Sequence, residues 1–186
     1  MAARSTFAAR RRVVPLIAIA ILMSAESGLA DPPAARTHRD PRSLFLIAKS
    51  ENKNQVHYGV HLDEACNVVG ASPLYGYWRM LENKGEIEPI LSREVRAYGV
   101  DPVQRIEKNG DATTIYARMN AIPDRQLRVT VARTEGRCEA RASMSIAGAD
   151  AHLSLIYIRL SWPFGVDYIL LRGSRALDGR SVEEKI

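Results

Sequence analysis

Apolar and polar residues alternate along most of the chain after Ser43, and this period of two constrains the fold more than any other feature. The alternation is clearest in residues 137–147, where every second residue from Cys138 to Ile146 is apolar and those between are polar. Successive side chains of a strand point to opposite faces, so such a segment has one face in a core and one in water. The chain is therefore predicted to be a β-protein.

Nine segments of predicted strand are separated by turns and loops. The strongest turn signal is Asn109-Gly110, because this dipeptide suits the positive φ that both positions of a tight hairpin require. The predicted strands are residues 44–49, 55–62, 73–80, 103–108, 111–120, 125–134, 137–147, 151–161 and 166–173. Short turns join the last six strands, which is typical of an antiparallel meander.

One of these strands departs from the alternation. Within 151–161, residues 155–158 read Leu-Ile-Tyr-Ile, with no polar residue between them. This strand is therefore either covered on both faces or interrupted by a bulge.

One helix is predicted, at residues 88–99. Pro89 stands near its start and Gly99 where helices commonly end, and apolar residues recur between them at helical spacing. Nine strands and one short helix make an all-β fold. We expect the meander to close into a small β-barrel, because closure removes exposed strand edges. A two-sheet β-sandwich is the alternative that the same strands allow.

The first 30 residues have the three-part pattern of a cleaved signal peptide. Four arginines accompany an apolar run of 11 residues, 13–23, and small residues stand at Gly28 and Ala30. The run is shorter than the roughly 20 apolar residues that a membrane span needs. We therefore predict export with cleavage after Ala30, which leaves no membrane span. An uncleaved N-terminal anchor is the alternative.

Residues 31–42 contain three prolines and no large apolar side chain, which is typical of a disordered linker. Residues 43–186 then form a single β-rich domain, long enough to bury a core. Removal of residues 1–30 takes away four Arg and one Glu, so the net charge falls from +5 to +2. This near-neutral balance indicates no nucleic-acid partner.

Both cysteines, Cys66 and Cys138, lie in the predicted mature chain. An even number of cysteines in an exported protein favours a disulfide between them, and two separate free thiols are the alternative. Zinc needs further Cys or His ligands close by, so no metal site is predicted. His57 and His61 would share one face of a strand about 13 Å apart, too far for one metal ion, and are interpreted as surface residues.

The sequence favours a non-enzymatic role. It has no G-x-S-x-G, G-x-x-x-x-G-K-[ST] or G-x-G-x-x-G pattern, which are signatures of hydrolases and of phosphate and dinucleotide binding. No catalytic residue and no cofactor are therefore predicted.

The segment PLYGYWRM supplies the candidates for ligand binding. On a strand, Trp78 and Met80 would face the core, while Tyr75, Tyr77 and Arg79 would share the opposite face. Tyr and Arg are residue types suited to binding, which makes these three the ligand-binding candidates. The alternative is an ordinary half-exposed strand face, where Tyr is also common.

Three parts of the chain are SLFLIAKSENKNQVHYGVHLD, PLYGYWRMLE with EPILSREVRAYGV, and the ending VDYILLRGSRALDGRSVEEKI. They resemble the bacterial family called domain of unknown function 4833, and the resemblance covers residues 43–186. It implies an exported or envelope protein of bacteria, and it brings no activity, substrate or catalytic residue.

These features predict a periplasmic or secreted protein whose β-barrel binds a small apolar ligand without catalysing a reaction. One alternative is an envelope protein, interacting or structural, that binds another protein through a face of its sheet. A second is an enzyme that acts on the cell wall or the outer membrane through a site without a known signature. The oligomeric state does not follow from the sequence.

Overall fold

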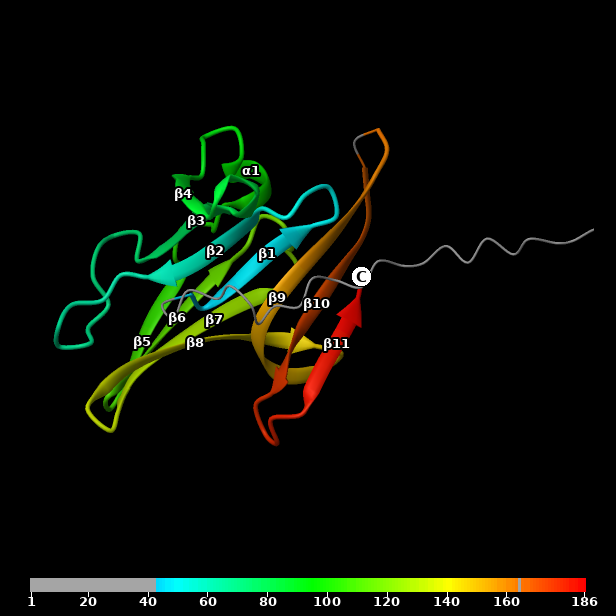
Figure 1. Ribbon diagram of the computed structural model, residues 1–186. Helices are drawn as coiled ribbons and strands as arrows, with labels where there is room; N and C mark the ends of the chain where they lie inside the picture. Colours follow the sequence, from blue (N-terminus) through cyan, green and yellow to red (C-terminus); the bar gives the residue numbers. More distant parts are fainter. Residues whose placement is uncertain (1–42, 164) are drawn as a thin grey trace, which may run out of the picture. The chain divides into compact units, whose positions relative to one another are not determined.

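The computed structural model describes residues 43–163 and 165–186, which form one sheet of eleven strands (Figure 1). The predicted signal peptide, 1–30, and the predicted linker, 31–42, lie outside the described residues. The strands are β1 (Phe45–Lys49), β2 (Gln55–Val60), β3 (Leu74–Met80), β4 (Glu86–Pro89), β5 (Arg105–Asn109), β6 (Ala112–Arg118), β7 (Gln126–Thr134), β8 (Arg137–Ile146), β9 (Ala149–Ser161), β10 (Gly165–Arg175) and β11 (Ser181–Lys185).

The sheet forks at β9, because this strand has three partners and only two edges. β10 pairs with β9 from Ala151 to Ser161 and so occupies one edge. The other edge is shared: its first part, residues 149–152, pairs with β8 in antiparallel orientation, and residues 155–158 pair with β1 in parallel orientation. The sheet therefore divides at residues 153–154 into a first arm, β1 to β4, and a second arm, β5 to β8.

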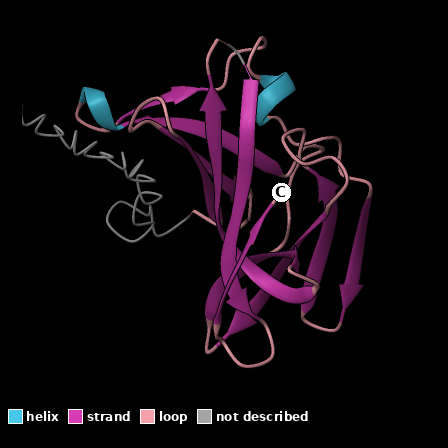
Figure 2. Ribbon diagram, turned by 90° about the vertical axis from the view of Figure 1, so that its right-hand side faces the viewer, coloured by secondary structure: helices cyan, strands magenta, loops and turns pink. Residues whose placement is uncertain are grey.

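The sheet curls strongly into a half-barrel that stays open (Figure 2). The strand order runs β4-β3-β2-β1-β9-β8-β7-β6-β5, and among the described residues β4 does not pair with β5. The predicted closed barrel and the alternative sandwich of two sheets are both wrong. The physical reason is the fork: two strands share one edge of β9, so the arms diverge instead of continuing around a cylinder.

The predicted helix at 88–99 is largely wrong. Its beginning belongs to β4, which pairs with β3 across a tight turn where Lys84 and Gly85 both have positive φ. Only α1 (Val95–Tyr98) is helical, and a short 3₁₀ turn, η1 (Leu81–Asn83), precedes β4. The carboxylate of Glu94 accepts hydrogen bonds from the indole of Trp78, at 3.0 Å, and from the backbone N–H of Leu91, at 2.9 Å. These bonds tie the segment to β3 before α1 begins.

α1 lies at the open end of the half-barrel, between the two arms. The hydroxyl of Tyr58 in β2 donates to the carbonyl of Tyr98 at 2.7 Å, and Asn120, after β6, donates to the carbonyl of Val95 at 2.8 Å. Tyr98 also meets the ring of Trp78 edge-on, with 5.1 Å between centroids. The helical segment therefore contacts both arms where strand pairing is missing.

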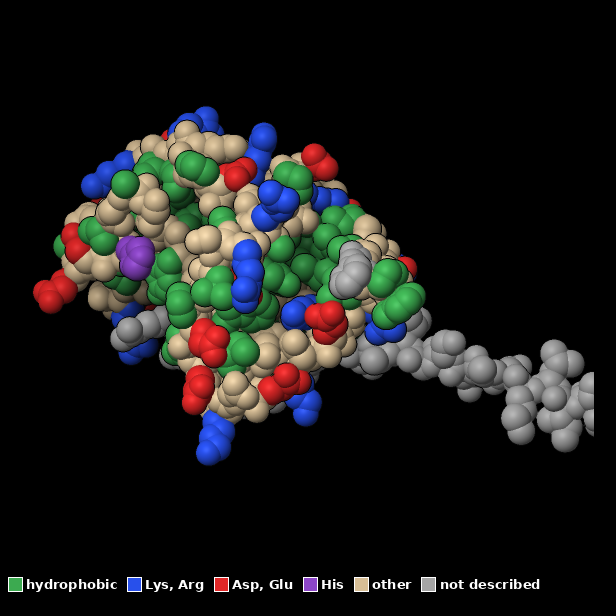
Figure 3. All heavy atoms as spheres, turned by 90° about the horizontal axis from the view of Figure 1, so that it is seen from above, with side chains coloured by type: hydrophobic (Ala, Val, Ile, Leu, Met, Phe, Trp, Pro, Cys, Tyr) green, Lys and Arg blue, Asp and Glu red, His purple; other side chains and the backbone are tan. Residues whose placement is uncertain are grey.

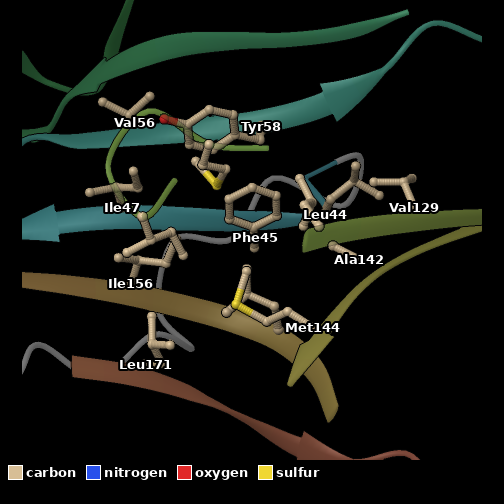
Figure 4. Close-up of a cluster of buried hydrophobic side chains, with 14 of the residues drawn as sticks. Leu44, Phe45, Ile47, Val56, Tyr58, Val129, Ala142, Met144, Ile156 and Leu171 are labelled. Atoms are coloured by element: carbon tan, nitrogen blue, oxygen red, sulfur yellow. The ribbon is translucent and has the colours of Figure 1, made fainter. Parts of the chain in front are cut away.

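The interior of the half-barrel is filled by apolar side chains from both arms and from β9 and β10 (Figure 4). Phe45 and Tyr58 stack at its centre with 4.6 Å between their centroids. The predicted alternation is confirmed in β6, β7 and β8, whereas β1 and β2 are buried along almost their whole length. Trp78 of β3 is 8% exposed as part of this core. A core packed in this way stabilises the fold and leaves the interior occupied by the protein itself.

The irregular strand β9 is covered on both faces and also contains a bulge, so both alternatives predicted for it are found. Ile156 and Ile158 face the main core, whereas Leu155 and Tyr157 belong to a second, smaller cluster on the opposite face of the sheet. A register shift in the β9–β10 pairing accompanies the change of face, opposite Arg172 and Gly173. The bulge lies next to the fork, at the point where β9 changes its partner from β8 to β1.

Candidate functional site

Two adjoining cavities open where the arms diverge. The first, which we call the aromatic cleft, has a volume of about 420 Å³ and lies between the end of β2 and β8. It is lined by Ser43, Leu44, Val60, His61, Leu62, Tyr75, Cys138 and Ala140. The second, the edge groove, has about 480 Å³ and follows β8 from residue 138 to 142 along the fork. The two share Leu44, Cys138 and Ala140.

An aromatic row forms one wall of the aromatic cleft. His61 stacks on Tyr75 with 4.4 Å between ring centroids, Tyr75 on Tyr77 at 6.2 Å, and Tyr77 on His57 at 5.6 Å. All four side chains lie on the outer face of β2 and β3, opposite the core. Only His61 and Tyr75, at one end of the row, line the cavity.

The position of Tyr75 follows from the glycine opposite it. Tyr75 pairs with Gly59 across β2 and β3, and a Cβ added at Gly59 would lie 2.5 Å from the Cζ and hydroxyl of the Tyr75 ring. The ring therefore lies flat over the backbone of Gly59, which only glycine permits. His61, two residues further along, stacks beside it and completes the aromatic end of the cleft.

The structure brings two of the three predicted binding residues together. Tyr75 and Tyr77 stack on each other, and Arg79 shares their face because it pairs with Gln55 in the same register. Arg79 lies four residues from Tyr75, about 13 Å along the strand, and does not line the aromatic cleft. Its Nε is buried and has no hydrogen-bond partner among the described residues.

The interpretation of His57 as a surface residue is wrong. His57 is 0% exposed, and its ring nitrogens lie 3.2 Å from the hydroxyl of Ser43 and 3.2 Å from the amide oxygen of Gln55. His57 sits in the middle of β2, between β1 and β3, where neighbouring side chains surround it. His61 follows the end of β2 and is exposed, as predicted.

A disulfide joins Cys66 to Cys138, with their Cα atoms 5.6 Å apart, as the even number of cysteines predicts. It links the loop between β2 and β3 to β8, and so ties the first arm to the second beside the aromatic cleft. The loop has its own bonds. The side chain and backbone amide of Asn67 donate to Asp63, which lowers the pKa of Asp63, and Arg133 of β7 donates to the carbonyl of Glu64 at 3.1 Å.

Sequence reasoning missed one contact of a catalytic type. Ser143 and His152 face each other across β8 and β9, with the Ser143 hydroxyl 3.0 Å from Nδ1 of His152. Asp150, the next polar residue on that face, forms an ion pair with Arg128. The contact therefore belongs to a polar surface on β7 to β9. No group of three His, Cys, Asp or Glu side chains in the described part of the chain is arranged to hold a metal ion.

The model of one protein family, described as domain of unknown function (DUF4833), matches residues 45–185, which extend from β1 to β11. The chain belongs to the DUF4833 family. This confirms the resemblance seen in the sequence, and it places the whole sheet within the DUF4833 domain, together with all the residues that line the two cavities except Ser43 and Leu44. No curated protein and no solved structure matches the chain. Of the helices in residues 43–163 and 165–186, none is long and apolar enough to cross a membrane.

Proposed function

We propose that this DUF4833 protein is an exported, non-enzymatic binding module that holds a small ligand, with both apolar and polar groups, in the aromatic cleft. The observation that carries the proposal is the cleft itself. Its 420 Å³ lies within the range of about 300–1,000 Å³ typical of small-molecule sites. Leu44, Val60 and Ala140 offer apolar contacts, while His61 and Tyr75 offer an aromatic surface with polar groups at its edge.

We place the ligand at the fork of the sheet, rather than in the barrel interior that the sequence suggested. Buried side chains fill the interior, so the aromatic cleft is the better place for a bound molecule. Within the predicted set of three, we assign ligand contact to Tyr75 and a positioning role to Tyr77, which stacks behind it. Arg79 remains a candidate only for a ligand long enough to follow β3.

Export is supported by the pattern of residues 1–30 and by the disulfide, because disulfides persist in oxidising compartments. Expression of the full chain in a bacterium, followed by mass spectrometry of the periplasmic fraction, tests it. We expect a mature protein that begins at Asp31. Full-length protein retained in the cytoplasm would contradict this part of the proposal.

Native extraction tests the binding function. The protein is purified from the periplasm without denaturation, extracted with organic solvent, and the extract is analysed by mass spectrometry. The variants are Tyr75→Ala and, as a matched control, Tyr116→Ala, which removes an aromatic ring of the second arm outside the aromatic cleft. We expect one compound from the wild type and the control and little from Tyr75→Ala. No compound, or equal amounts from all three proteins, would overturn the proposal.

The distribution of charged side chains on the face shown in Figure 3 does not favour a polyanionic ligand. On this face, Lys and Arg side chains are interspersed with Asp and Glu around apolar patches. Recognition of nucleic acid relies on basic side chains gathered on one face. The mixed charges of this face agree with the net charge of +2 that the predicted mature chain carries.

A further inference from the structure

The two halves of β8 have different surroundings. Residues 143–146 pair with β9, and Ser143 pairs with β7 as well, whereas residues 137–142 pair with β7 and with no other described strand. Residues 137–142 are therefore an unpaired edge within the sheet, because the part of β9 that could continue along them pairs with β1 instead. The edge groove of about 480 Å³ runs along this edge.

The turn between β7 and β8 determines which backbone groups face the groove. It has two residues, Glu135 and Gly136, both with positive φ, so Thr134 and Arg137 close the hairpin as a hydrogen-bonded pair. Hydrogen-bonded and non-bonded pairs then alternate. The backbone N–H and C=O groups of residues 138, 140 and 142 therefore point away from β7 and into the edge groove.

The next part of the strand supports this alternation. The same pattern directs the backbone of Met144 and Ile146 toward β9, where they pair with Ala151 and Ala149. Residues 138, 140 and 142 thus continue a row of hydrogen-bonding groups that β9 uses further along. At residues 138, 140 and 142, no strand of the described chain lies opposite these hydrogen-bonding groups.

The side chains along the edge leave room for another strand. Ala140 and Ala142 point inward and are small, Cys138 on the same face carries the disulfide to Cys66, and Leu44 and Leu153 form the apolar floor of the groove. Glu139 and Arg141 point outward and form an ion pair of 3.0 Å. The outermost strand β4 ends in a proline, a feature that hinders pairing at that edge.

We propose that the β8 edge from Cys138 to Ala142 binds an extended peptide segment of a partner protein as an added strand. The segment would hydrogen-bond to residues 138, 140 and 142 and place small apolar side chains over Leu44 and Leu153. Its outward side chains would be basic opposite Glu139 and acidic opposite Arg141. Strand addition of this kind draws affinity from the backbone and specificity from alternate side chains. The site goes beyond the small-ligand function and does not depend on it.

A peptide that copies residues 138–143, with Ser in place of Cys138, is a suitable probe, because in this register it ends before Ser143, where β8 pairs with β9. When it lies antiparallel to β8 and centred on Ala140, its Arg141 meets Glu139 of the protein and its Glu139 meets Arg141. The peptide carries a fluorophore, and its anisotropy is measured with the oxidised protein. We expect saturable binding, and absence of binding at millimolar protein would overturn the proposal.

Two methylated peptides test whether the contact is made through the backbone. N-methylation at the peptide's Ala140 removes an N–H that faces β8, whereas N-methylation at its Arg141 alters an N–H that faces away. We expect the first to weaken binding by about tenfold or more and the second to have little effect. Equal effects of the two methyl groups would overturn strand addition.

An exchange of charges tests the register. The variant Glu139→Arg/Arg141→Glu keeps both charges on the strand but faces the original peptide with like charges. We expect it to lose binding to that peptide and to recover it with a peptide carrying the same exchange. Failure to recover, with a circular dichroism spectrum like that of the wild type, would overturn the register. A dimer in solution that the peptide dissociates would show that a second copy, rather than a partner segment, occupies the edge.

Discussion

At the scale of single residues, Gly59 is predicted to control the aromatic cleft. A methyl group at this position would lie 2.5 Å from the end of the Tyr75 ring, which must then swing away from His61. Because the outer end of a half-buried side chain at the surface can move, we expect Gly59→Ala to lower the free energy of unfolding by only about 1 kcal/mol. The ligand recovered by native extraction should nevertheless be lost.

Gly76 provides the matched control, because it faces the other side of the same sheet. A Cβ there would lie 2.7 Å from Ile90 and 3.1 Å from the Tyr58 ring, both in the interior. Gly76→Ala should therefore destabilise the fold by about 1–3 kcal/mol in a urea titration. If Gly59→Ala proves the more destabilising of the two and retains the ligand, the assignment of Tyr75 to the cleft is wrong.

Glu184 is predicted to make stability depend on pH. Hydrogen bonds from Arg125 at 2.6 and 2.8 Å, and from the backbone N–H of Ala147, lower the pKa of Glu184 below its ordinary 4.5. A depressed pKa contributes stability above pH 4.5, which is lost as the pH falls through the folded-state value. We expect Glu184→Gln to unfold about 1 kcal/mol more easily at pH 7 and to show a shallower loss of stability in acid.

The control for this measurement is Glu88→Gln, which removes the same charge from an exposed position in β4. Urea titrations between pH 3 and 7 compare the two variants with the wild type. An acid profile of Glu184→Gln identical to that of the wild type would show that the pair with Arg125 does not hold β11 against the turn after β8.

Single residues also show how far sequence reasoning reaches. Alternation assigned Trp78 to the core and placed Tyr75 and Tyr77 together on the other face, because the face of a side chain depends only on its position within its own strand. It could not predict that His57 is buried, because burial on the outer face depends on neighbours brought in by other strands. The signal for His61 was weak: a polar residue just after a strand, beside a tyrosine of the next strand.

At the scale of elements, β8 is predicted to show two kinds of amide. The amides of residues 139 and 141 donate to β7, whereas those of 138, 140 and 142 face the edge groove. Hydrogen exchange followed by NMR should therefore be slower at 139 and 141, by about tenfold or more, than at the three groove-facing positions. Uniform protection along 138–142 would mean that the edge is already occupied.

Elements were predicted well where local patterns determine them. Each of the nine predicted strands exists, since alternation and turn dipeptides act within a few residues. β4 and β11 were missed because they are short and rich in Glu, so their apolar pattern is weak. The helix predicted over 88–99 is mostly replaced by β4 and loop, because pairing with β3 outweighs the helical spacing of a few apolar residues.

At the scale of the whole molecule, the sequence predicted strands but not closure. The parallel pairing of β1 with β9 joins segments more than a hundred residues apart, and nothing in either strand specifies that partner. That pairing makes β1 and β8 share one edge, which opens the barrel and creates both cavities. The candidate site was therefore predictable in part: the tyrosines could be named, but the opposite wall, from β8, could not.

The disulfide is predicted to hold the two arms of the open sheet together. Apart from β9 and the contacts of α1, no strand pairing joins the arms within residues 43–163 and 165–186, and the bridge closes a loop with a sequence separation of 72. Loop entropy then predicts that Cys66→Ser/Cys138→Ser lowers the free energy of unfolding by about 4 kcal/mol.

Urea titration of the variant and of the wild type, each with and without dithiothreitol, provides the measurement. Reductant should destabilise only the wild type and bring it to the level of the variant. A variant within 1 kcal/mol of the oxidised wild type would show that β9 and α1 alone keep the arms in place, and that the width of the aromatic cleft does not depend on the bridge.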